Sequence, residues 1–479
     1  MMDLKKILQE RFGYANFRLG QEEVIRHVLD NRDTVAILPT GMGKSLCYQL
    51  PGSIMEGSVL IVSPLVSLME DQAMRMRQNG EKRVIALNSF LPFNERKRII
   101  GQLQNFKFIF ISPEMLSQEA FARKLNGLLI SLVVVDEAHC ISQWGFDFRP
   151  DYLRIGEFLK KGNRPPILAL TATADEKVLN DIQRYLRMEK PIIQRHSLDR
   201  PNISYSIREV NSAFEKTAWI KERVATTVGP GIIYASSRKR ADELAMELQL
   251  EGVAVQSYHA GKDQEDRSII QEQFLNGELE WICATNAFGM GVHKDDIRQV
   301  IHDHLPPTIA AYIQEVGRAG RDGRQAAATL LYVPADEHTT SFIIQSDMPS
   351  EEEIRHYNTM ISEGHPSEKA AELASLTETG KRVIDYYTER YSLNDILLRL
   401  KGLADEKTEQ LQQMMHLIKS GTCIRQNALS YFGESCQSKP DECCSNCGLG
   451  TSDWLQESEN RKSAKERVSW DERITILLG

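Results

Sequence analysis

The sequence predicts an α/β fold in which two parallel-sheet lobes are followed by a helical region. The main observation is a set of short apolar runs that alternate with amphipathic segments, which is typical of a parallel sheet with helices on both faces. In the first lobe such runs occupy 34–38, 59–62, 108–111, 130–135 and 167–170. The same scheme returns at 231–234, 253–255, 281–284 and 329–332, which indicates a second lobe and a cleft between the two.

A turn joins the two expected lobes. Residues Asp199-Arg200-Pro201-Asn202 have turn composition and lie in a crossover over 197–206. After about residue 340 the strand pattern fades, and 382–419 is rich in Leu, Glu, Lys and Gln at helical spacing. We therefore divide the chain into a first lobe (1–205), a second lobe (206–340), a helical subdomain (341–450) and a polar tail (451–479).

The composition is that of an ordinary globular protein. Of its 479 residues 42% are hydrophobic and 26% are charged, and no run approaches the ~20 apolar residues of a membrane span. The start of the chain leads into a mixed amphipathic segment rather than a secretory signal, so we expect a cytoplasmic protein with no membrane partner. The net charge of −8 excludes a polycationic coat, and any contact with nucleic acid must come from local grooves.

A phosphate-binding loop follows the first apolar run. In Pro39-Thr40-Gly41-Met42-Gly43-Lys44-Ser45 the glycines let backbone N–H groups approach phosphate, Lys44 reaches the β- and γ-phosphates, and the Ser45 hydroxyl binds Mg²⁺. This is a Walker A loop, although Leu38 stands where the general pattern has its first glycine. We therefore expect ATP and Mg²⁺ to be held here. The expected contacts are Thr40, Gly41, Gly43, Lys44 and Ser45.

Two further segments supply the chemistry of hydrolysis. The run 130–135 delivers Asp136, which is expected to hold Mg²⁺ through water, and Glu137, which is expected to polarise the attacking water. In 314–323 Arg318 and Arg321 lie three residues apart, on one helical face, so both can point into the cleft and stabilise charge on the γ-phosphate. The alternative for these arginines is ordinary surface ion pairing.

An aromatic and cationic segment begins three residues after the box Asp136-Glu137-Ala138-His139. Its aromatic side chains suit stacking on exposed bases, and its arginine suits phosphate, so the segment predicts binding of single-stranded nucleic acid beside the ATP site. The alternative is a hydrophobic plug under the sheet. The residues concerned are Trp144, Phe146, Phe148 and Arg149.

Five of the eight cysteines fall between 423 and 447. Cys423, Cys436, Cys444 and Cys447 follow a C-x12-C-x7-C-x2-C pattern, and the last pair has the spacing that tetrahedral Zn²⁺ takes. The pattern predicts a closed structural zinc site. Two alternatives stay open, namely Cys443 in place of Cys444 as a ligand and a disulfide scaffold.

These motifs, in this order, resemble the RecQ family of superfamily 2 DNA helicases over about residues 10–447. Tyr14, Arg18 and Gln21 match the family's adenine-recognising element. Residues 63–72, which include Ser67, resemble the turn that grips the DNA backbone, and Tyr258-His259-Ala260-Gly261 matches a family motif from which we assign His259 to DNA. The resemblance implies two tandem RecA-like lobes and a helical zinc-binding subdomain.

The resemblance also implies an ATP-dependent DNA helicase with 3′ to 5′ polarity, acting in repair, recombination or replication restart. Its expected partners are single-stranded and partly duplex DNA, with single-strand-binding or repair proteins. The family's aromatic loop usually reads W-G-H-D-F-R-P, and Phe146 replaces its histidine, so coupling between DNA and hydrolysis is expected to differ. The chain resembles a short form without winged-helix and C-terminal helical DNA-binding domains. The rivals are an ATP-driven DNA clamp or remodeller with little unwinding and an RNA helicase.

Overall fold

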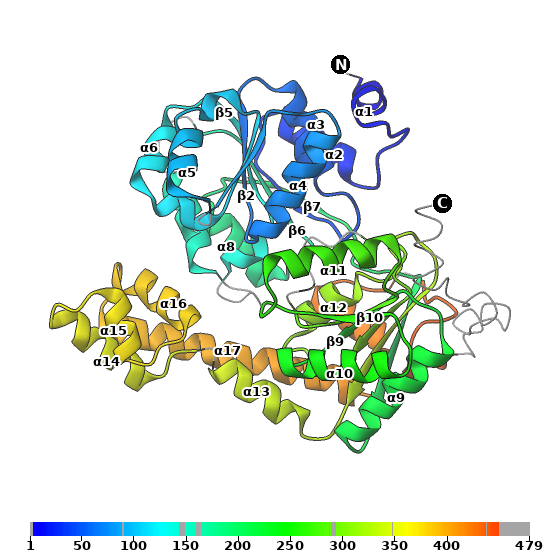
Figure 1. Ribbon diagram of the computed structural model, residues 1–479. Coiled ribbons are helices and arrows are strands. Elements are labelled where there is room, and N and C mark those ends of the chain that lie inside the picture. Colours follow the sequence, from blue (N-terminus) through cyan, green and yellow to red (C-terminus); the bar gives the residue numbers. More distant parts are fainter. Residues whose placement is uncertain are drawn as a thin grey trace, which may run out of the picture.

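The computed structural model describes residues 3–88, 91–142, 149–159, 164–286, 288, 294–346, 348–436 and 438–449. Two α/β lobes lie one above the other, and a group of helices extends beside them (Figure 1). The expected fold class is confirmed. Among the described residues, no helix is long and apolar enough to cross a membrane.

The first lobe is built on a seven-stranded parallel sheet with the order β3-β4-β2-β5-β6-β1-β7. The central strands are almost entirely buried because helices cover both faces, which explains their continuous apolar runs. The strands are β1 Thr34–Ile37, β2 Ser58–Val62, β3 Val84–Leu87, β4 Phe108–Ile111, β5 Ile130–Val135, β6 Ile167–Thr171 and β7 Ile192–Arg195.

Helices α2, α3 and α4 pack on one face of this sheet, and α5 to α8 pack on the other, each around its own apolar cluster (Figure 1). The helix α1 covers α2 and α3. The helices are α1 Leu4–Phe12, α2 Gln21–Leu29, α3 Leu46–Ile54, α4 Val66–Gln78, α5 Phe93–Ile100, α6 Glu119–Asn126, α7 Leu153–Phe158 and α8 Glu176–Tyr185.

The second lobe has a six-stranded parallel sheet with the order β10-β11-β9-β12-β13-β8. Its strands are β8 Ile203–Glu209, β9 Gly231–Tyr234, β10 Val255–Tyr258, β11 Trp281–Ala284, β12 Gln299–His302 and β13 Ala326–Tyr332. Its helices are α9 Ala213–Thr226, α10 Arg238–Leu250, α11 Gln264–Asn276 and α12 Ile309–Val316.

The run expected as a strand over 253–255 begins later than predicted, because β10 starts at Val255. The Val253 N–H instead donates to the Leu248 carbonyl and closes the end of α10, with Gly252 at a φ of 82°. The chain leaves the first sheet at Arg195 and enters the second at Ile203. The expected lobe boundary at 205 therefore falls inside β8.

Among the described residues, the C-terminal helices share the cores of the two lobes. Helices α14 to α16 and the start of α17 share the apolar cluster of the first lobe, while the end of α17 and α18 share that of the second. In Figure 1, α17 runs from the α14 to α16 group to the second lobe. The helices are α13 Asp336–Ser346, α14 Glu351–Ser362, α15 Ser367–Leu373, α16 Glu378–Thr388, α17 Leu393–Lys419 and α18 Ile424–Tyr431.

Candidate ATP site, nucleic-acid channel and zinc cluster

The predicted phosphate loop joins β1 to α3, at the carboxyl edge of the first sheet. Gly41 and Gly43 have φ values of 86° and 72°, a conformation that favours glycine. A Cβ on Gly43 would lie 2.8 Å from the Gln21 amide nitrogen. Ser45 immediately precedes the first residue of α3, so its hydroxyl stands at a helix N-terminus, where anions are favoured. Local backbone geometry thus fits a nucleotide phosphate.

Lys44 and the acidic pair lie together. The Lys44 Nζ is 3.6 Å from Glu137 Oε1, and both side chains are largely buried. The Lys44 ammonium makes no hydrogen bond within the described part of the chain, so its donors stay available for phosphate oxygens. Asp136 follows β5 directly, and its N–H donates to the Val62 carbonyl at the end of β2. The donor set therefore fits a magnesium nucleotide.

Burial and charge separate the two carboxyl groups. Burial and the neighbouring Glu137 raise the pKa of Asp136 to about 6. Burial also acts to raise the pKa of Glu137, but Lys44, His139 and Arg318 together hold that pKa below its ordinary value. Glu137 has a φ of 46° and a ψ of 50°, a left-handed conformation that is costly for a non-glycine residue and concentrates at functional sites. Glu137 thus keeps its charge to lower pH than Asp136 does.

His139 connects this pair to the end of β6. Its Nδ1 lies 3.4 Å from Glu137 Oε2 and 3.1 Å from the Thr171 hydroxyl, which donates to the Thr173 carbonyl. These contacts link the acidic box to residues 171–174, which form the end of β6 and the turn after it.

The three residues predicted for adenine lie beside the phosphate loop. The Gln21 amide donates to the Met42 and Gly43 carbonyls, and its oxygen accepts from the Arg18 N–H. The Arg18 guanidinium donates to the Gly41 carbonyl. Tyr14 is 58% exposed, so its ring is available for stacking. Gln21 and Arg18 therefore shape the loop directly, in addition to the base contact predicted for them.

The loop of the second lobe that carries Arg318 and Arg321 meets the phosphate loop across the cleft. A Cβ on Gly41 would lie 2.9 Å from Arg321 Cγ, and the Thr40 hydroxyl donates to the Gly317 carbonyl at 2.9 Å. Burial and the like charge of Arg318 lower the pKa of Arg321 to about 10. Two buried guanidinium groups this close to each other and to a phosphate loop fit a multiply charged anion between the lobes.

The prediction that Arg318 and Arg321 lie on one face of a helix is wrong. The helix α12 ends at Val316, so Arg318 and Arg321 lie in the turns that follow it. Gly317 caps the helix, and Gly320 has a φ of 55°, which a continuing helix does not allow. Both arginines nevertheless reach the cleft, because the loop folds back against the phosphate loop.

A cavity of about 1040 Å³ opens between the lobes. The first lobe contributes Leu65 and Arg149, and the Arg149 guanidinium donates to the Pro64 carbonyl at 2.9 Å. The second lobe contributes residues that follow four of its strands, and α17 contributes Lys407 and Gln410. The lining from the second lobe includes Ser236, Ser237, Arg238, Lys239, Tyr258, Ala260, Thr285 and Asn286.

Most of the residues that line this cavity were not predicted as binding residues from the sequence. Ser236, Ser237 and Arg238 follow β9 and lead into α10, which is the same strand-to-helix arrangement that identified the phosphate loop. This strand-to-helix pattern could therefore have indicated a binding site in the second lobe, although no characteristic residue type accompanies it. No pattern in the sequence placed Lys407 or Gln410 of α17 beside this cavity.

The predicted DNA contacts divide into three groups. Arg149 lines the cavity. Trp144, Phe146 and Phe148 lie outside the described residues, and so does the side chain of Ser67. His259 is 6% exposed, its Nε2 lies 3.0 Å from Asp242 Oδ1, and its Nδ1 accepts from the Gly261 N–H, so it stabilises the end of β10 instead of lining the cavity.

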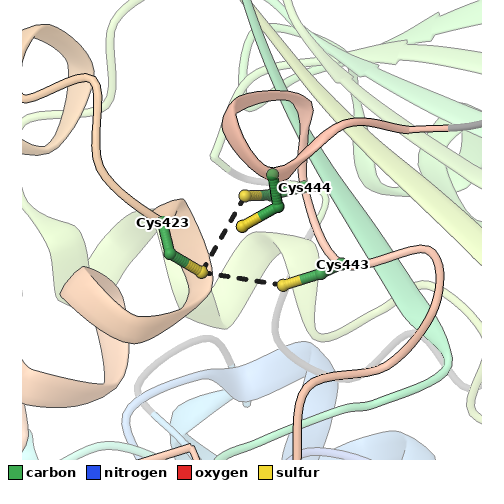
Figure 2. A group of neighbouring side chains, drawn as sticks. Cys423, Cys443 and Cys444 are labelled. Carbon is green, nitrogen blue, oxygen red and sulfur yellow. Dashed lines mark hydrogen bonds between the residues drawn. The ribbon is translucent and has the colours of Figure 1, made fainter.

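Four cysteines form a cluster between α18 and the turn at 445–447. The sulfurs of Cys423, Cys443, Cys444 and Cys447 lie within 4.8 Å of one another. Figure 2 shows Cys423 facing both Cys443 and Cys444, at 3.6 and 3.9 Å between sulfurs. Tetrahedral zinc with bonds of about 2.3 Å separates its sulfurs by roughly 3.8 Å, so the cluster fits Zn²⁺.

This cluster differs from the predicted ligand set at one position. Cys436 stands outside it, since its sulfur donates to the Ser438 carbonyl at 3.3 Å, and Cys443 takes the fourth place. Cys443 is thus not an alternative to Cys444, because both face Cys423. The fold decides this point, since the bridge between Tyr205 and Cys444 and the Tyr205 N–H bond to the Cys443 carbonyl place both against β8.

Two lobes with a phosphate loop facing arginines across a cleft define the class of the helicase ATPases. Three family models match the chain: DEAD/DEAH box helicase over 18–182, helicase conserved C-terminal domain over 215–323 and RecQ zinc-binding over 394–448. Among solved structures, the helicase MrfA bound to DNA and AMPPNP has a TM-score of 0.58 at 18% identity, covering 71% of this chain and 52% of that one. Dbp5 of S. cerevisiae bound to RNA and ADP BeF3 has a TM-score of 0.58 at 19% identity, covering 71% and 90%. These two similarities concern the fold.

Sequence relatives narrow the class further. The probable ATP-dependent DNA helicase RecS of Bacillus subtilis is 40% identical, over 97% of this chain and 96% of that protein. The ATP-dependent DNA helicase RecQ of Pasteurella multocida is 42% identical over 69% of this chain and 52% of that protein, so the chain spans about half of that relative. The chain belongs to the RecQ family of ATP-dependent DNA helicases.

Proposed function

We propose that this chain hydrolyses ATP between its lobes to move 3′ to 5′ along single-stranded DNA and to separate duplex strands. The observation that carries the proposal is the contact of the phosphate loop with the loop of the second lobe, where Thr40 binds the Gly317 carbonyl at 2.9 Å and Arg321 packs on Gly41. An anion bound at this contact holds the lobes together, and its loss lets them separate.

Each residue of the ATP site has a distinct proposed role. Lys44 and the backbone around Gly41 and Gly43 hold the β- and γ-phosphates. Glu137 stays ionised and accepts a hydrogen bond from the attacking water. Arg318 and Arg321 stabilise the charge that develops on the γ-phosphate.

Magnesium supplies charge neutralisation between the β- and γ-phosphates when it is bound. Ser45 and Asp136 are the residues proposed to hold it. Tyr14, with Arg18 and Gln21, is proposed to orient the adenine. Zinc, held by Cys423, Cys443, Cys444 and Cys447, would stabilise the fold of the helical region and take no part in hydrolysis.

The cavity between the lobes is the proposed path of the DNA strand. Arg149 of the first lobe and Arg238 of the second both line it and carry cationic side chains that suit phosphate. Ser236 and Ser237 stand at the N-terminal end of α10, where hydroxyl and N–H groups suit phosphate. Because the two walls belong to different lobes, closing and opening of the lobes changes the distance between two grips on one strand. This is the basis of stepwise movement, which we place in repair, recombination or replication restart together with single-strand-binding or repair proteins.

Strand separation tests the proposal. We expect a duplex with a 3′ single-stranded tail to be unwound at saturating ATP, while a duplex with a 5′ tail is not. Unwinding only from the 5′ tail would contradict the proposed polarity. Hydrolysis that depends on single strands without any unwinding would favour the clamp or remodeller, and stimulation by RNA but not by DNA would favour the RNA helicase.

A further inference from the structure

The turn between the lobes binds the loop that carries Arg318 and Arg321. The Arg200 guanidinium donates to three backbone carbonyls of that loop, at 3.2, 3.1 and 2.6 Å. These carbonyls belong to Gly317, Ala319 and Gly320. One planar side chain therefore fixes the backbone on both sides of Arg318 and immediately before Arg321, which three donors of a flexible ammonium could not match.

Asn202, two residues further along the turn, holds the same loop. Its amide nitrogen donates to the carbonyls of Gly320 and Arg324, both at 2.8 Å. Gly320 has a φ of 55°, and a Cβ at this position would lie 2.5 Å from the Asn202 amide nitrogen. Any larger residue at 320 would push the loop away from the turn.

The Gly317 carbonyl is shared between the turn and the phosphate loop. It accepts from Arg200 Nη1 at 3.2 Å and from the Thr40 hydroxyl at 2.9 Å, which uses both lone pairs of the oxygen. A Cβ on Gly317 would lie 2.7 Å from that hydroxyl. The position of this one carbonyl therefore fixes the position of the arginine loop, residues 317–324 with Arg318 and Arg321, relative to the proposed γ-phosphate site.

The turn is itself anchored by Arg425 of α18. Arg425 is 1% exposed, and its Nη1 donates to Asp199 Oδ1 at 2.5 Å and to the Arg200 carbonyl at 2.9 Å. Its guanidinium carbon lies 4.9 Å from the centre of the Tyr205 ring. The helical region that carries the cysteine cluster thus holds the turn in place through Arg425.

We propose that Arg200 is a positioning residue for ATP hydrolysis. It holds the loop of Arg318 and Arg321 in register with the phosphate loop, and Arg425 holds Arg200. This inference rests on the roles proposed above for Arg318 and Arg321. A guanidinium that only stabilised the fold would affect unfolding, whereas a positioning residue affects turnover at full ATP occupancy.

The first experiment compares Arg200→Lys and Arg200→Ala with Arg77→Lys. Arg77 is a matched control because its guanidinium also donates to a backbone carbonyl, that of Val84, at 3.3 and 3.0 Å, away from the cleft. We expect Arg200→Lys to lower kcat of DNA-stimulated hydrolysis by about tenfold or more, because misplaced transition-state donors cost that much. KM for ATP should stay within about twofold, since Lys44 and its loop still bind the phosphates. Arg77→Lys should keep wild-type kcat, and wild-type kcat in folded Arg200→Lys would overturn the proposal.

A double-mutant cycle separates the two proposals. With the pair Arg318→Ala/Arg321→Ala as one arm of the cycle, we expect added Arg200→Ala to lower kcat by less than about twofold more, because neither arginine is left for Arg200 to position. A full multiplicative loss would show that Arg200 acts elsewhere. If Arg318→Ala and Arg321→Ala each turn over at the wild-type rate, the roles given to those arginines fail. If they are impaired while the Arg200 variants are not, only the positioning role fails.

Discussion

Lys44 is the residue on which the ATP site depends most directly. Its ammonium is buried 3.6 Å from Glu137 and makes no hydrogen bond among the described residues. The Glu137 carboxylate offsets part of the cost of burying this charge, and phosphate oxygens would supply the hydrogen-bond acceptors that the ammonium lacks. Its place in the loop could be predicted from sequence, because glycines, lysine and serine at this spacing have one dominant use.

We expect Lys44→Ala to reduce ATP hydrolysis to about 1% of the wild-type rate or less, since it removes the cation that contacts the transferred phosphate. A phosphate-release assay with excess single-stranded DNA measures this. Lys82→Ala, which alters an exposed lysine of the same lobe, should hydrolyse normally. Near-normal hydrolysis by the Lys44 variant would place the ATP site elsewhere in the molecule.

Other residues at this scale could not be predicted. Nothing in the sequence indicates that Glu137 adopts a φ of 46°, that both nitrogens of His259 are engaged inside the second lobe, or that Arg200 binds three carbonyls. The Arg200 contacts depend on partners more than 100 positions along the chain, and the other two features depend on the exact local backbone, which the folded molecule sets.

At the scale of elements, the cysteine cluster joins α18 to the turn at 445–447. The C-x2-C spacing correctly indicated the last two members, because a short turn brings such sulfurs to one side. No short spacing of this kind links Cys423 to the remaining member of the cluster, so the spacing does not show whether that member is Cys436 or Cys443. The choice between Cys436 and Cys443 is made by β8, against which Cys443 and Cys444 are packed.

We therefore expect Cys443→Ser to lose bound zinc and Cys436→Ser to keep about one zinc per chain, because only the former removes a sulfur of the cluster. Elemental analysis of the purified variants measures this. Both substitutions exchange one sulfur for oxygen, so they control for each other. Zinc retained by Cys443→Ser and lost by Cys436→Ser would restore the ligand set that the sequence spacing predicts.

The sequence also failed to predict the backbone of the arginine loop that follows α12. Residue spacing predicted one helical face for Arg318 and Arg321, yet Gly317 caps the helix before either is reached. The glycines around these arginines were the available signal, because Gly320 occupies a left-handed conformation and lies against Asn202.

At the scale of the whole molecule, α17 ties the two lobes together. It has 27 residues and is therefore about 40 Å long at about 1.5 Å per residue. Ile396, Leu400 and Leu403 belong to the core of the first lobe, while Leu411, Met414 and Leu417 belong to that of the second. Between them Glu406 forms an ion pair with Lys177 of α8 at 3.1 Å. Any change in the stiffness of α17 therefore reaches both lobes.

Gly402 lies inside α17, and a Cβ added there would meet nothing within 4 Å. We expect Gly402→Ala to raise the free energy of unfolding by about 0.5–1 kcal/mol, because alanine loses less backbone entropy in a helix. Thermal unfolding followed by circular dichroism measures this as a higher Tm. Gly421 also has open space but a φ of 65°, so Gly421→Ala should lower Tm. A lower Tm for Gly402→Ala would mean that the helix needs a flexible point between the lobes.

The sequence by itself determined the two parallel-sheet lobes, their order and the places of the phosphate loop and the acidic box along the chain. These follow from local patterns, since apolar periodicity and glycine spacing act within a few residues. The tertiary structure alone decided which cysteines cluster, how Arg318 and Arg321 reach the phosphate loop, and how Arg425 and Arg200 connect the helical region to that loop. Several of the deciding contacts join residues more than 100 positions apart, such as Arg200 with Gly317, Arg425 with Asp199 and Tyr205 with Cys443. Local sequence carries no information on such pairs, because the packing of whole lobes fixes their separation.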